Sequence, residues 1–565
     1  MNTKQLTLIP LGGMGEVTQN MFVYEYGNEI LIVDCGIGFP DVYMPGVDAI
    51  IPDISYLLKQ LQQGKKIVGL LLSHGHDDHI AALPYLLPEL PKFPIYASPL
   101  AAGFAAERMD DAGVKRDIQV MPNKKVQKLS NNFSFEFFAV THSVPDTRHI
   151  LIQTPVGNIY HGSDFKLDPH PVDGVLTDFE HITQLGKKGI LLMLMDCLRV
   201  ERQKWTKSES TTGPVIAQEM QTTKGKFVVT LMSSHIHRIQ QVVDAAAQHQ
   251  RKVAFVGRSV EQNVRIAGQL KKLKLPKSVV IDKRDLGKYP DHQLCVIIAG
   301  SQGQEGSSLV RAVYDEHRIV QINKNDKVVF SADAIPGNEV PYFKAVDELC
   351  RNDVEVIYPD VNPNVHQSGH ASSVEQQELL SLVKPQLVMP IGGADRHRTK
   401  FWELVAKPLN IPEKQVLRPK TGQVMAFNQQ GYQGVVKKVT LNPKTIDGLG
   451  IGDVGPIVLS DRRSLSQAGI VVVVIPRSKG RWLFKEIMVV SRGFVFMREA
   501  DEVIKFIKDH TTKIIKKAGK KTPEHELKRL IERRLGRKLY KVIKREPMIV
   551  PVIMETGHHQ GKRKH

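Results

Sequence analysis

Short apolar runs separated by turns fill the first 200 residues of the chain. Runs such as "EILIVDCG", "IVGLLLSHG", "FSFEFFAVTHS" and "GNIYHGSD" are rich in β-branched and aromatic residues and end in polar clusters. Runs of this length and composition are typical of β-strands. Helical patterns lie between them, so this part of the chain predicts an α/β fold of layered sheets with helices outside.

A second series of apolar runs covers residues 205–365. The segments "KFVVTLMSS", "KVAFVGRS", "QLCVIIAGSQG" and "KVVFSADAIPG" alternate with helical patterns such as "HRIQQVVDAAAQHQ". Strands that are buried on both faces read as continuous apolar runs. The segment therefore predicts a doubly wound, largely parallel sheet.

The remaining residues predict two smaller pieces. The stretch "SSVEQQELLSLVKPQLVMPIGG" is typical of a helix followed by a buried strand. Beyond about residue 460 the pattern predicts a small α+β domain, with basic helices near 500–518 and 523–540 and a last strand "MIVPVIME". The chain then ends in a basic tail, "GHHQGKRKH".

The composition of the chain indicates the kind of partner and the cellular compartment to expect. The net charge of +18 attracts polyanions, so nucleic acid is the leading partner, with a solvated basic surface as the alternative. No apolar stretch of about 18 residues and no signal peptide is evident, so we expect a cytoplasmic protein without a membrane partner. The few cysteines are scattered, which fits small core residues in a reducing compartment: Cys35, Cys197, Cys295 and Cys350.

The most informative motif is "SHGHDDH", which follows the apolar run "IVGLLL" and contains His74, His76, Asp78 and His79. In an extended loop, residues i and i+2 share a face. His74 and His76 can therefore bind one cation while Asp78 and His79 turn toward a second. Imidazole combined with carboxylate favours zinc or manganese. An ordinary surface loop is the alternative, but the H-x-H-x-D-H spacing argues against it.

Two more metal-binding side chains follow apolar strands: His142 in "FFAVTHSVPDT" and Asp164 in "GNIYHGSDF". Taken singly, each also fits a core histidine or a turn-capping aspartate. Taken together, they complete a two-metal site. In this hypothesis His74, His76 and His142 bind one ion, Asp78 and His79 bind the other, and Asp164 bridges both. Two ions roughly 3.5 to 4 Å apart would activate a hydroxide and stabilise the charge of an attacked phosphate.

This residue set resembles the metallo-β-lactamase superfamily, whose signature is H-x-H-x-D-H followed by a distant His and a distant Asp. Further motifs resemble ribonuclease J, a family of bacterial β-CASP nucleases. They occur in that family's order over nearly the whole chain: "LGGMGEVTQN", "VTHSVPD", "GSQGQEGSSL", "IPGNE", "HQSGHAS", "DGLGIGDVG", "LSDRRSLSQAGIVVVVI" and "SRGFVFMRE". The resemblance implies a metallo-β-lactamase αββα sandwich with an inserted doubly wound β-CASP domain and a small C-terminal α+β domain.

Domain boundaries follow from combining the pattern with this resemblance. The lactamase-like domain is expected in two parts, 1–205 and 366–430, on either side of a β-CASP domain at 206–365. A linker at 431–460, a C-terminal domain at 461–555 and a basic tail at 556–565 complete the predicted order.

The resemblance also implies an activity. Ribonuclease J proteins act in RNA maturation and decay, as 5′-to-3′ exonucleases on 5′-monophosphorylated RNA with some endonuclease activity. The implied cofactors are two divalent ions, zinc first, with manganese or magnesium as alternatives. The implied partners are RNA, further copies of the chain in a dimer or tetramer, and another ribonuclease in a hetero-oligomer.

Substrate-binding residues are carried over from matching motifs. "NVHQSGHAS" matches the family stretch that binds the substrate phosphate, which implicates His366, Gln367, Ser368, Gly369 and His370. Small residues allow backbone N–H groups to approach a phosphate, and His370 is expected to stabilise the scissile phosphate or to protonate the leaving oxygen. A plain Ser/Gly loop that closes a strand is the alternative.

"SSHIHRIQQ" resembles the start of a phosphate-contacting loop in the inserted domain and suggests Ser234, His237 and Arg238. An ordinary helix N-cap at Ser233 or Ser234 is nearly as good an interpretation. Asp196 keeps a carboxylate that is expected to orient a metal-binding histidine, so the predicted catalytic set is Asp78, Asp196 and His370.

The chain departs from the family pattern at two places. Where the family has P-V-H-G-E, this chain has "PIGGADRHR", which puts Gly392 at the position of a metal-binding histidine and Ala394 at that of a glutamate. Asp395 or His397 is a candidate replacement ligand, with water as the alternative. After Asp196 the family has Ser-Thr-Asn, whereas this chain has "CLR". We therefore expect a weaker second metal site and reduced activity.

Three functions remain open at this point. The first is the metal-dependent ribonuclease, favoured by the intact metal motif and His370. The second is a weakly active or inactive RNA-binding paralogue that serves as a subunit of a degradation complex, favoured by Gly392 and Ala394. The third is a β-CASP nuclease that acts on DNA. The C-terminal "SRGFVFMRE" region favours the first over the third.

Overall fold

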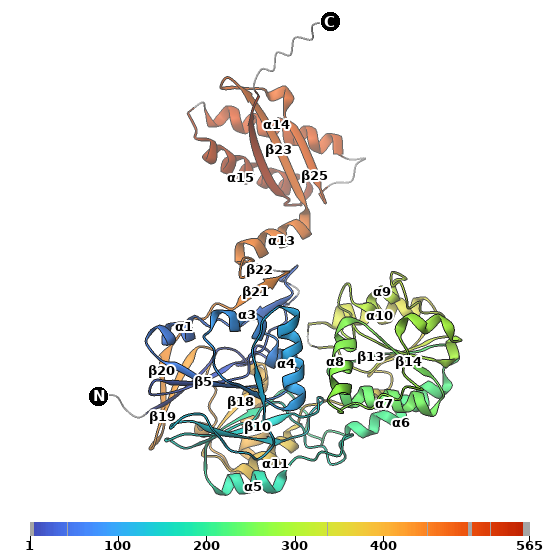
Figure 1. The fold of residues 1–565 in the computed structure, drawn as a ribbon. Helices are drawn as coiled ribbons and strands as arrows, with labels where there is room; N and C mark the ends of the chain where they lie inside the picture. Colours follow the sequence, from blue (N-terminus) through green and yellow to red (C-terminus); the bar gives the residue numbers. More distant parts are fainter. Residues whose placement is uncertain are drawn as a thin grey trace. The chain divides into compact units, whose positions relative to one another are not determined.

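The computed structural model describes residues 5–41, 43–335, 337–448, 450–494, 500–519 and 521–556. It contains two compact units, one formed by residues 1–39 and 49–444 and the other by residues 40–48 and 445–565. The first unit holds all of the predicted metal-binding residues. Figure 1 shows the fold, coloured along the sequence.

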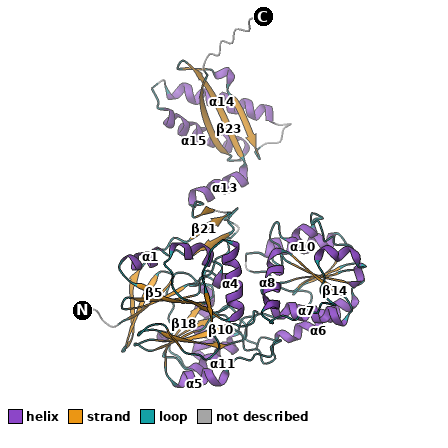
Figure 2. Cartoon of the chain, viewed as in Figure 1, coloured by secondary structure: helices purple, strands orange, loops and turns teal. Residues whose placement is uncertain are grey.

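The core of the first unit lies between two β-sheets (Figure 2). Apolar side chains such as Leu31 and Val33 from one sheet meet Phe135, Phe137 and Ile150 from the other. The first sheet has the order β20 (Gly431–Lys438), β19 (Gln423–Asn428), β1 (Leu6–Pro10), β2 (Phe22–Tyr26), β3 (Glu29–Val33), β5 (Lys66–Leu71), β6 (Ile95–Ala97) and β7 (Ile118–Val120). The second has the order β18 (Leu387–Ile391), β12 (Ile190–Asp196), β11 (Asn158–His161), β10 (Arg148–Gln153), β9 (Ser134–Ala139) and β8 (Gln127–Lys128).

Helices complete the four layers. On the outer face of the second sheet, apolar side chains of Ile182, Leu185, Leu379 and Leu380 pack against residues such as Met193. The helices of this region are α5 (Phe179–Lys187), α11 (Ser373–Val383), α12 (Asp395–Phe401) and a π-helical turn at Trp402–Ala406. The other helices of the lactamase-like part are α1 (Ser55–Gln62), α2 (Asp77–Ile80), α3 (Leu83–Leu86) and α4 (Pro99–Asp111), with a short strand β4 at Ala49–Ile51. The αββα sandwich expected from the sequence is confirmed.

The doubly wound prediction for the middle of the chain is also confirmed. Every pairing in this five-stranded sheet is parallel, and its order is β14 (Lys252–Val256), β15 (Leu294–Ile298), β13 (Phe227–Thr230), β16 (Lys327–Phe330) and β17 (Glu355–Ile357). Its helices are α6 (Thr212–Thr222), α7 (Ile236–Gln248), α8 (Arg258–Gln269), α9 (Ser308–Val313) and α10 (Glu339–Arg351). Parallel strands need long crossover connections, which these helices provide.

The second unit contains the expected small α+β domain. Strand β23 (Ile470–Ser478) pairs with β25 (Met488–Arg492) on one side and β26 (Met548–Glu555) on the other. Buried residues of β23 share a core with helices α14 (Ala500–Ala518) and α15 (Glu524–Ile543). The remaining elements of this region are β21 (Lys444–Asp447), β22 (Gly450–Ile451), α13 (Pro456–Ala468) and β24 (Arg481–Trp482).

Short 3₁₀ turns connect many of these elements. They lie at Leu87–Glu89, Glu209–Thr211, Lys283–Lys288, Asp291–Gln293, Pro363–Val365, Lys407–Leu409, Glu413–Gln415 and Phe484–Glu486.

One predicted boundary differs from the structure. The sequence predicts a linker over residues 431–460, but residues 431–438 form β20, the edge strand of the first sheet. The pattern missed this strand because β20 is largely exposed and carries polar residues on both faces. The predicted basic tail lies outside the described residues, apart from Thr556.

Two smaller expectations concern cysteines and membranes. Cys35, Cys197 and Cys295 are buried free thiols and Cys350 is exposed, so three of the four are core residues. In the described part of the chain, no helix combines the length and apolar character that a membrane span requires.

Candidate metal centre

The "SHGHDDH" motif lies directly after β5, at the end of the first sheet. His74 lies in the loop after β5 and His76 is in extended backbone. Helix α2 then begins at Asp77, so Asp78 and His79 lie on a helical turn. Gly75 between the two histidines packs against Phe104, and a Cβ atom there would lie 2.7 Å from the Phe104 ring. A side chain at this position would therefore displace the turn.

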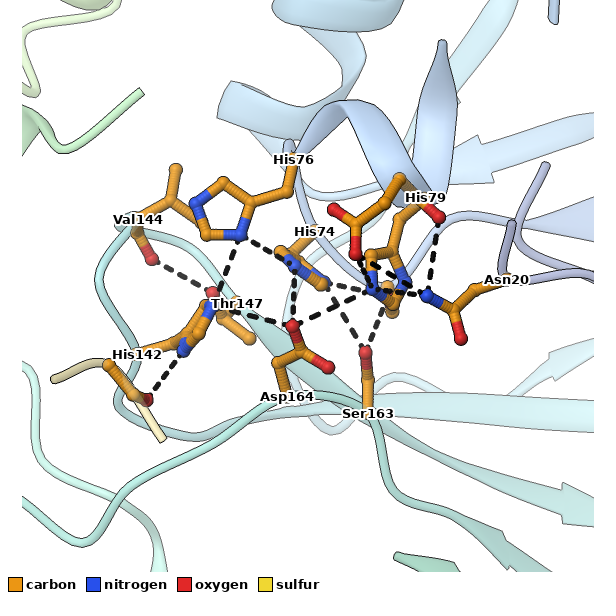
Figure 3. A network of polar contacts seen from close by, with 12 residues as sticks. Asn20, His74, His76, His79, His142, Val144, Thr147, Ser163 and Asp164 are labelled. Carbon is orange, nitrogen blue, oxygen red and sulfur yellow. Dashed lines mark hydrogen bonds and ion pairs between the residues drawn. The ribbon is translucent and has the colours of Figure 1, made fainter. Parts of the chain in front are cut away.

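His74, His76, His142 and Asp164 form the first donor cluster (Figure 3). One donor atom from each lies within 4.8 Å of the others. The Nδ1 atom of His76 is 3.1 Å from Nε2 of both His74 and His142, and each of those Nε2 atoms is 3.7 Å from an Asp164 oxygen. Three imidazoles and one carboxylate at this spacing fit the coordination sphere of a divalent metal ion.

The second cluster shares Asp164 and adds Asp78 and His79. The Nε2 atom of His79 lies 3.5 Å from an Asp78 oxygen and 3.6 Å from an Asp164 oxygen. All three side chains are largely buried. Asp164 therefore lies between the two clusters, at the position that the sequence hypothesis assigns to a bridging ligand.

Asp34, which the sequence interpretation missed, fixes His79 and Ser73 through hydrogen bonds. It follows β3 with a left-handed φ of 61° and is 1% exposed. His79 Nδ1 donates to its carboxylate at 2.8 Å, and the Ser73 hydroxyl donates to the same oxygen at 2.8 Å. Ser73 in turn accepts from His74 Nδ1 at 2.9 Å. The visible signal was an aspartate at the end of "EILIVDCG", a strand beside the one that precedes the motif.

Burial keeps the imidazoles of the first cluster in the neutral form that binds a cation. It lowers the pKa of His74 and His142 well below the usual value, and it lowers the pKa of His76 to about 3. All three imidazoles are therefore neutral at neutral pH, and neutral imidazole is the form that binds metal.

The second cluster holds a proton instead. Burial alone would lower the pKa of His79, but the carboxylates of Asp78, Asp164 and Asp34 outweigh burial and raise it well above the usual value. Burial also raises the pKa of Asp78 to about 6. A cation that binds here must displace the proton from His79.

His370 and Asp196 form, together with Asp164, a third group of possible metal donors beside the second cluster. His370 Nδ1 donates to an Asp196 oxygen at 2.7 Å, and His370 Nε2 lies 4.0 Å from Asp164. Burial opposes a charged imidazole, but Asp196 and Asp164 outweigh it and raise the pKa of His370 to about 9. Gly369 contributes its carbonyl oxygen, which accepts from His142 Nδ1 at 2.7 Å. The predicted loop and the predicted metal ligands are thus in direct contact.

Arg238 differs from its predicted role. Its guanidinium is fully buried and donates to Glu209 through two nitrogens, at 2.9 and 2.6 Å. Its other N–H groups donate to the carbonyl oxygens of Ser331 and Gln367 and to His366 Nδ1. All five donors are therefore used within the protein, which makes Arg238 a residue that positions the loop at 366–370.

His237 and Ser234 also lie outside the donor clusters. His237 Nε2 is 3.2 Å from an Asp173 oxygen, and Ser234 is in the turn before α7. The N-cap of α7 is His235, and no side chain caps the helix, so neither Ser233 nor Ser234 has the expected capping role. His235 is 3% exposed and lies 3.5 Å from Glu209.

Gly392 faces the second cluster, as the motif comparison predicts. A Cβ atom at Gly392 would lie 3.6 Å from Asp196 Oδ1 and 3.8 Å from Asp164 Oδ1, and its φ is 63°. The two candidate replacements are engaged elsewhere: Asp395 pairs with Arg398 at 3.0 Å, and His397 lies 3.8 Å from Glu201. Neither belongs to a donor cluster among the described residues.

Comparisons with known proteins agree with this geometry. The chain matches family models described as "Metallo-beta-lactamase superfamily" at residues 14–162, "Ribonuclease J, beta-CASP domain" at 224–349 and "Ribonuclease J C-terminal domain" at 457–556. It is 34% identical to Ribonuclease J2 of Bacillus subtilis over 98% of this chain and 99% of that protein. It is 34% identical to Ribonuclease J of Thermus thermophilus over 97% of this chain and 95% of that protein.

A solved structure of a protein of unknown function from Enterococcus faecalis has a similar fold. It aligns with a TM-score of 0.52 at 15% identity and covers 75% of this chain and 100% of its own. At this identity the likeness concerns the fold alone.

We expect the two clusters to differ in proton release when zinc is titrated into the metal-free protein. The first ion binds imidazoles that are already neutral, whereas the second displaces about one proton from His79. Affinity for the second ion should therefore rise with pH, and affinity for the first should change little. Isothermal titration calorimetry in buffers of different ionisation enthalpy measures both. Equal proton release for the two ions would contradict the assignment.

We expect Asp34→Asn to weaken metal binding by about 10- to 100-fold, because it removes the charge that orients His79 and Ser73. A competition titration with a chromophoric chelator measures the change. Asp53→Asn is a matched control: Asp53 is also a buried carboxylate that accepts backbone N–H groups, from Ser55 and Asn442, but it lies outside the clusters. Unchanged affinity in Asp34→Asn would rule out this role.

Proposed function

Because the chain belongs to the ribonuclease J family, we propose that it is a metal-dependent ribonuclease that hydrolyses phosphodiester bonds in RNA. The observation that carries the proposal is the meeting of the two donor clusters with the His370–Asp196 pair. Metal donors and a charged imidazole at one place are what hydrolysis of a phosphodiester requires.

The residues have separate roles in this proposal. Divalent ions, zinc first, would polarise the phosphate and activate water. His74, His76, His142, Asp164, Asp78 and His79 would hold them. Asp196 keeps His370 charged and directs its Nδ1 inward, which leaves the Nε2–H free to donate to the substrate. His370 is therefore placed to stabilise the attacked phosphate or to protonate the leaving oxygen.

The loop at 366–370 would receive the substrate phosphate. Gly369 lies so close to His142 and Ser143 that a Cβ atom there would be 2.8 Å from the Ser143 Cβ, so only glycine fits. The Ser368 hydroxyl accepts from the His370 backbone N–H at 3.1 Å. Arg238 supports the loop from behind through the Gln367 carbonyl oxygen and His366. A rigid loop of small residues suits the close approach of a phosphate.

The direction of cleavage, the preferred RNA end and the assembly of the protein are proposed from its family. We propose 5′-to-3′ exonuclease action on 5′-monophosphorylated RNA, with some endonuclease action, in cytoplasmic RNA maturation and decay. We also propose that the protein assembles as a homodimer or homotetramer and binds another ribonuclease. The net charge of +18 supports RNA as the substrate, because a positive field captures polyanions.

Gly392 favours a second candidate, a weakly active RNA-binding subunit. The second cluster has three donor residues, and neither Asp395 nor His397 supplies a fourth. Asp196 adjoins it, but its carboxylate is bonded to His370. A loosely held second ion would lower the rate without abolishing RNA binding.

One assay separates these functions. The full-length protein is incubated with Mn²⁺ or Zn²⁺ and with 5′-monophosphorylated RNA, 5′-triphosphorylated RNA or single-stranded DNA. We expect mononucleotides from the monophosphorylated RNA and a loss of at least about 100-fold in Asp78→Ala, because Asp78 belongs to the second donor cluster. Binding without cleavage in every metal would support the subunit role, and preferential cleavage of DNA would overturn both.

A second experiment tests Gly392. We expect Gly392→His to raise the content of the second metal, because its Cβ atom faces Asp164 and Asp196. Gly392→Ala is the matched control: it carries the same cost of about 1 kcal/mol for a left-handed backbone but adds no donor. Elemental analysis of the purified proteins gives the metal-to-protein ratio. Equal ratios in the two variants would show that the position does not limit metal binding.

A further inference from the structure

Arg199 lies beside the loop that contains His370. It follows β12, whose last residue, Asp196, accepts from the Leu198 backbone N–H at 2.8 Å and so turns the chain. Arg199 then forms a parallel backbone bridge with Ser372, two residues beyond His370. The turn is also tied to the strand end before Gly392, because the Cys197 N–H donates to the Ile391 carbonyl oxygen at 3.0 Å.

The guanidinium of Arg199 has no partner among the described residues. Its side chain is partly buried, and its Nε atom is fully buried without a hydrogen bond. Other buried arginines are used structurally: Arg238, Arg251 and Arg398 all donate to carboxylates or backbone carbonyl oxygens. A partly desolvated cation without a hydrogen-bonded or ion-paired partner is costly, so Arg199 is a group that gains from an anionic ligand.

Charged groups of both domains surround Arg199. Burial lowers the pKa of Arg199, and so does the charge of Arg202, whereas the carboxylates of Asp333, which follows β16, and of Glu375 oppose that shift. The charge of Arg199 in turn helps to lower the pKa of His366, after burial and Arg238. Arg199 and Asp333 form no ion pair within 4.0 Å in the described part of the chain, so the guanidinium is not neutralised there.

We propose that Arg199 binds a phosphate of the RNA next to the one that contacts His370, an inference that rests on the proposed ribonuclease function. A guanidinium matches the geometry of a phosphate and donates to two of its oxygens at once. Arg199 stands where the family pattern has an asparagine, so this contact is a property of this chain.

The alternative is that Arg199 attracts Asp333 and thereby only holds the inserted domain in place. The two roles differ in what Asp333→Asn does. If Arg199 binds phosphate, removing the Asp333 charge strengthens RNA binding, because a competing carboxylate is lost. If Arg199 acts only on Asp333, then Asp333→Asn weakens RNA binding as Arg199→Ala does.

The experiment measures binding of a fluorescein-labelled, 5′-monophosphorylated RNA with phosphorothioate linkages, which resist hydrolysis. Anisotropy titrations with the full-length, metal-loaded protein are made over a range of salt concentrations. For Arg199→Ala we expect about a 10-fold loss of affinity and a plot of log K against log salt that is shallower by about 0.7, the contribution of one contact to a single strand. Arg199→Lys should recover the slope but only part of the affinity, because it keeps the charge and loses the second donor.

Arg351→Ala is the matched control. Arg351 is an exposed arginine at the end of α10, and its guanidinium pairs with Glu348 on the same helix. We expect it to leave affinity and slope unchanged. Circular dichroism of each variant confirms that the fold is intact.

The two proposals fail in different ways. Parental affinity and slope in Arg199→Ala, or weaker binding in Asp333→Asn, would overturn the Arg199 assignment and leave the ribonuclease untouched. RNA binding that depends on Arg199 without cleavage in any metal would overturn the ribonuclease alone. A chain that binds no RNA would overturn both.

Discussion

The carboxylate of Asp164 lies 3.6 to 3.7 Å from three imidazoles, those of His74, His79 and His142, and all four side chains are buried. Burying these groups together is costly unless each has a partner or a cation. The donors come from separate connections of the two sheets, and they converge only because both sheets end at the same place. The rest of the lactamase-like fold serves to hold this cluster.

Hydrogen bonds from residues around the clusters fix the orientation of the histidine rings. His79 is fixed by Asp34, His74 by Ser73 and His142 by the Gly369 carbonyl oxygen. Each of these bonds uses the ring nitrogen that points away from the cluster, which leaves the other nitrogen free for a cation. The contact through Gly369 also joins the first cluster to the loop at 366–370, so the position of that loop and the geometry of the first cluster depend on each other.

Charge is distributed unequally across the site. The first cluster contains imidazoles that burial keeps neutral, while the second contains a charged His79 among carboxylates. Gly392 leaves the second cluster with few donors, and its left-handed backbone allows the chain to turn without a side chain at that point. The cation His370 lies beside the same carboxylates, bonded to Asp196 at 2.7 Å and 4.0 Å from Asp164.

The sequence by itself determined the features that depend on local pattern. The apolar runs located both sheets of the sandwich and the parallel sheet, and the periodicity of the last 70 residues located α14 and α15. The H-x-H-x-D-H spacing identified four residues of the two donor clusters. These features follow from the alternation of side chains along one segment. Only the tertiary structure decided that Arg238 is fully used within the protein, that Asp34 holds His79, that β20 completes a sheet and that Asp395 and His397 point elsewhere. Each of these depends on partners far away in the sequence, and the spacing of residues along the chain does not contain the distances between them.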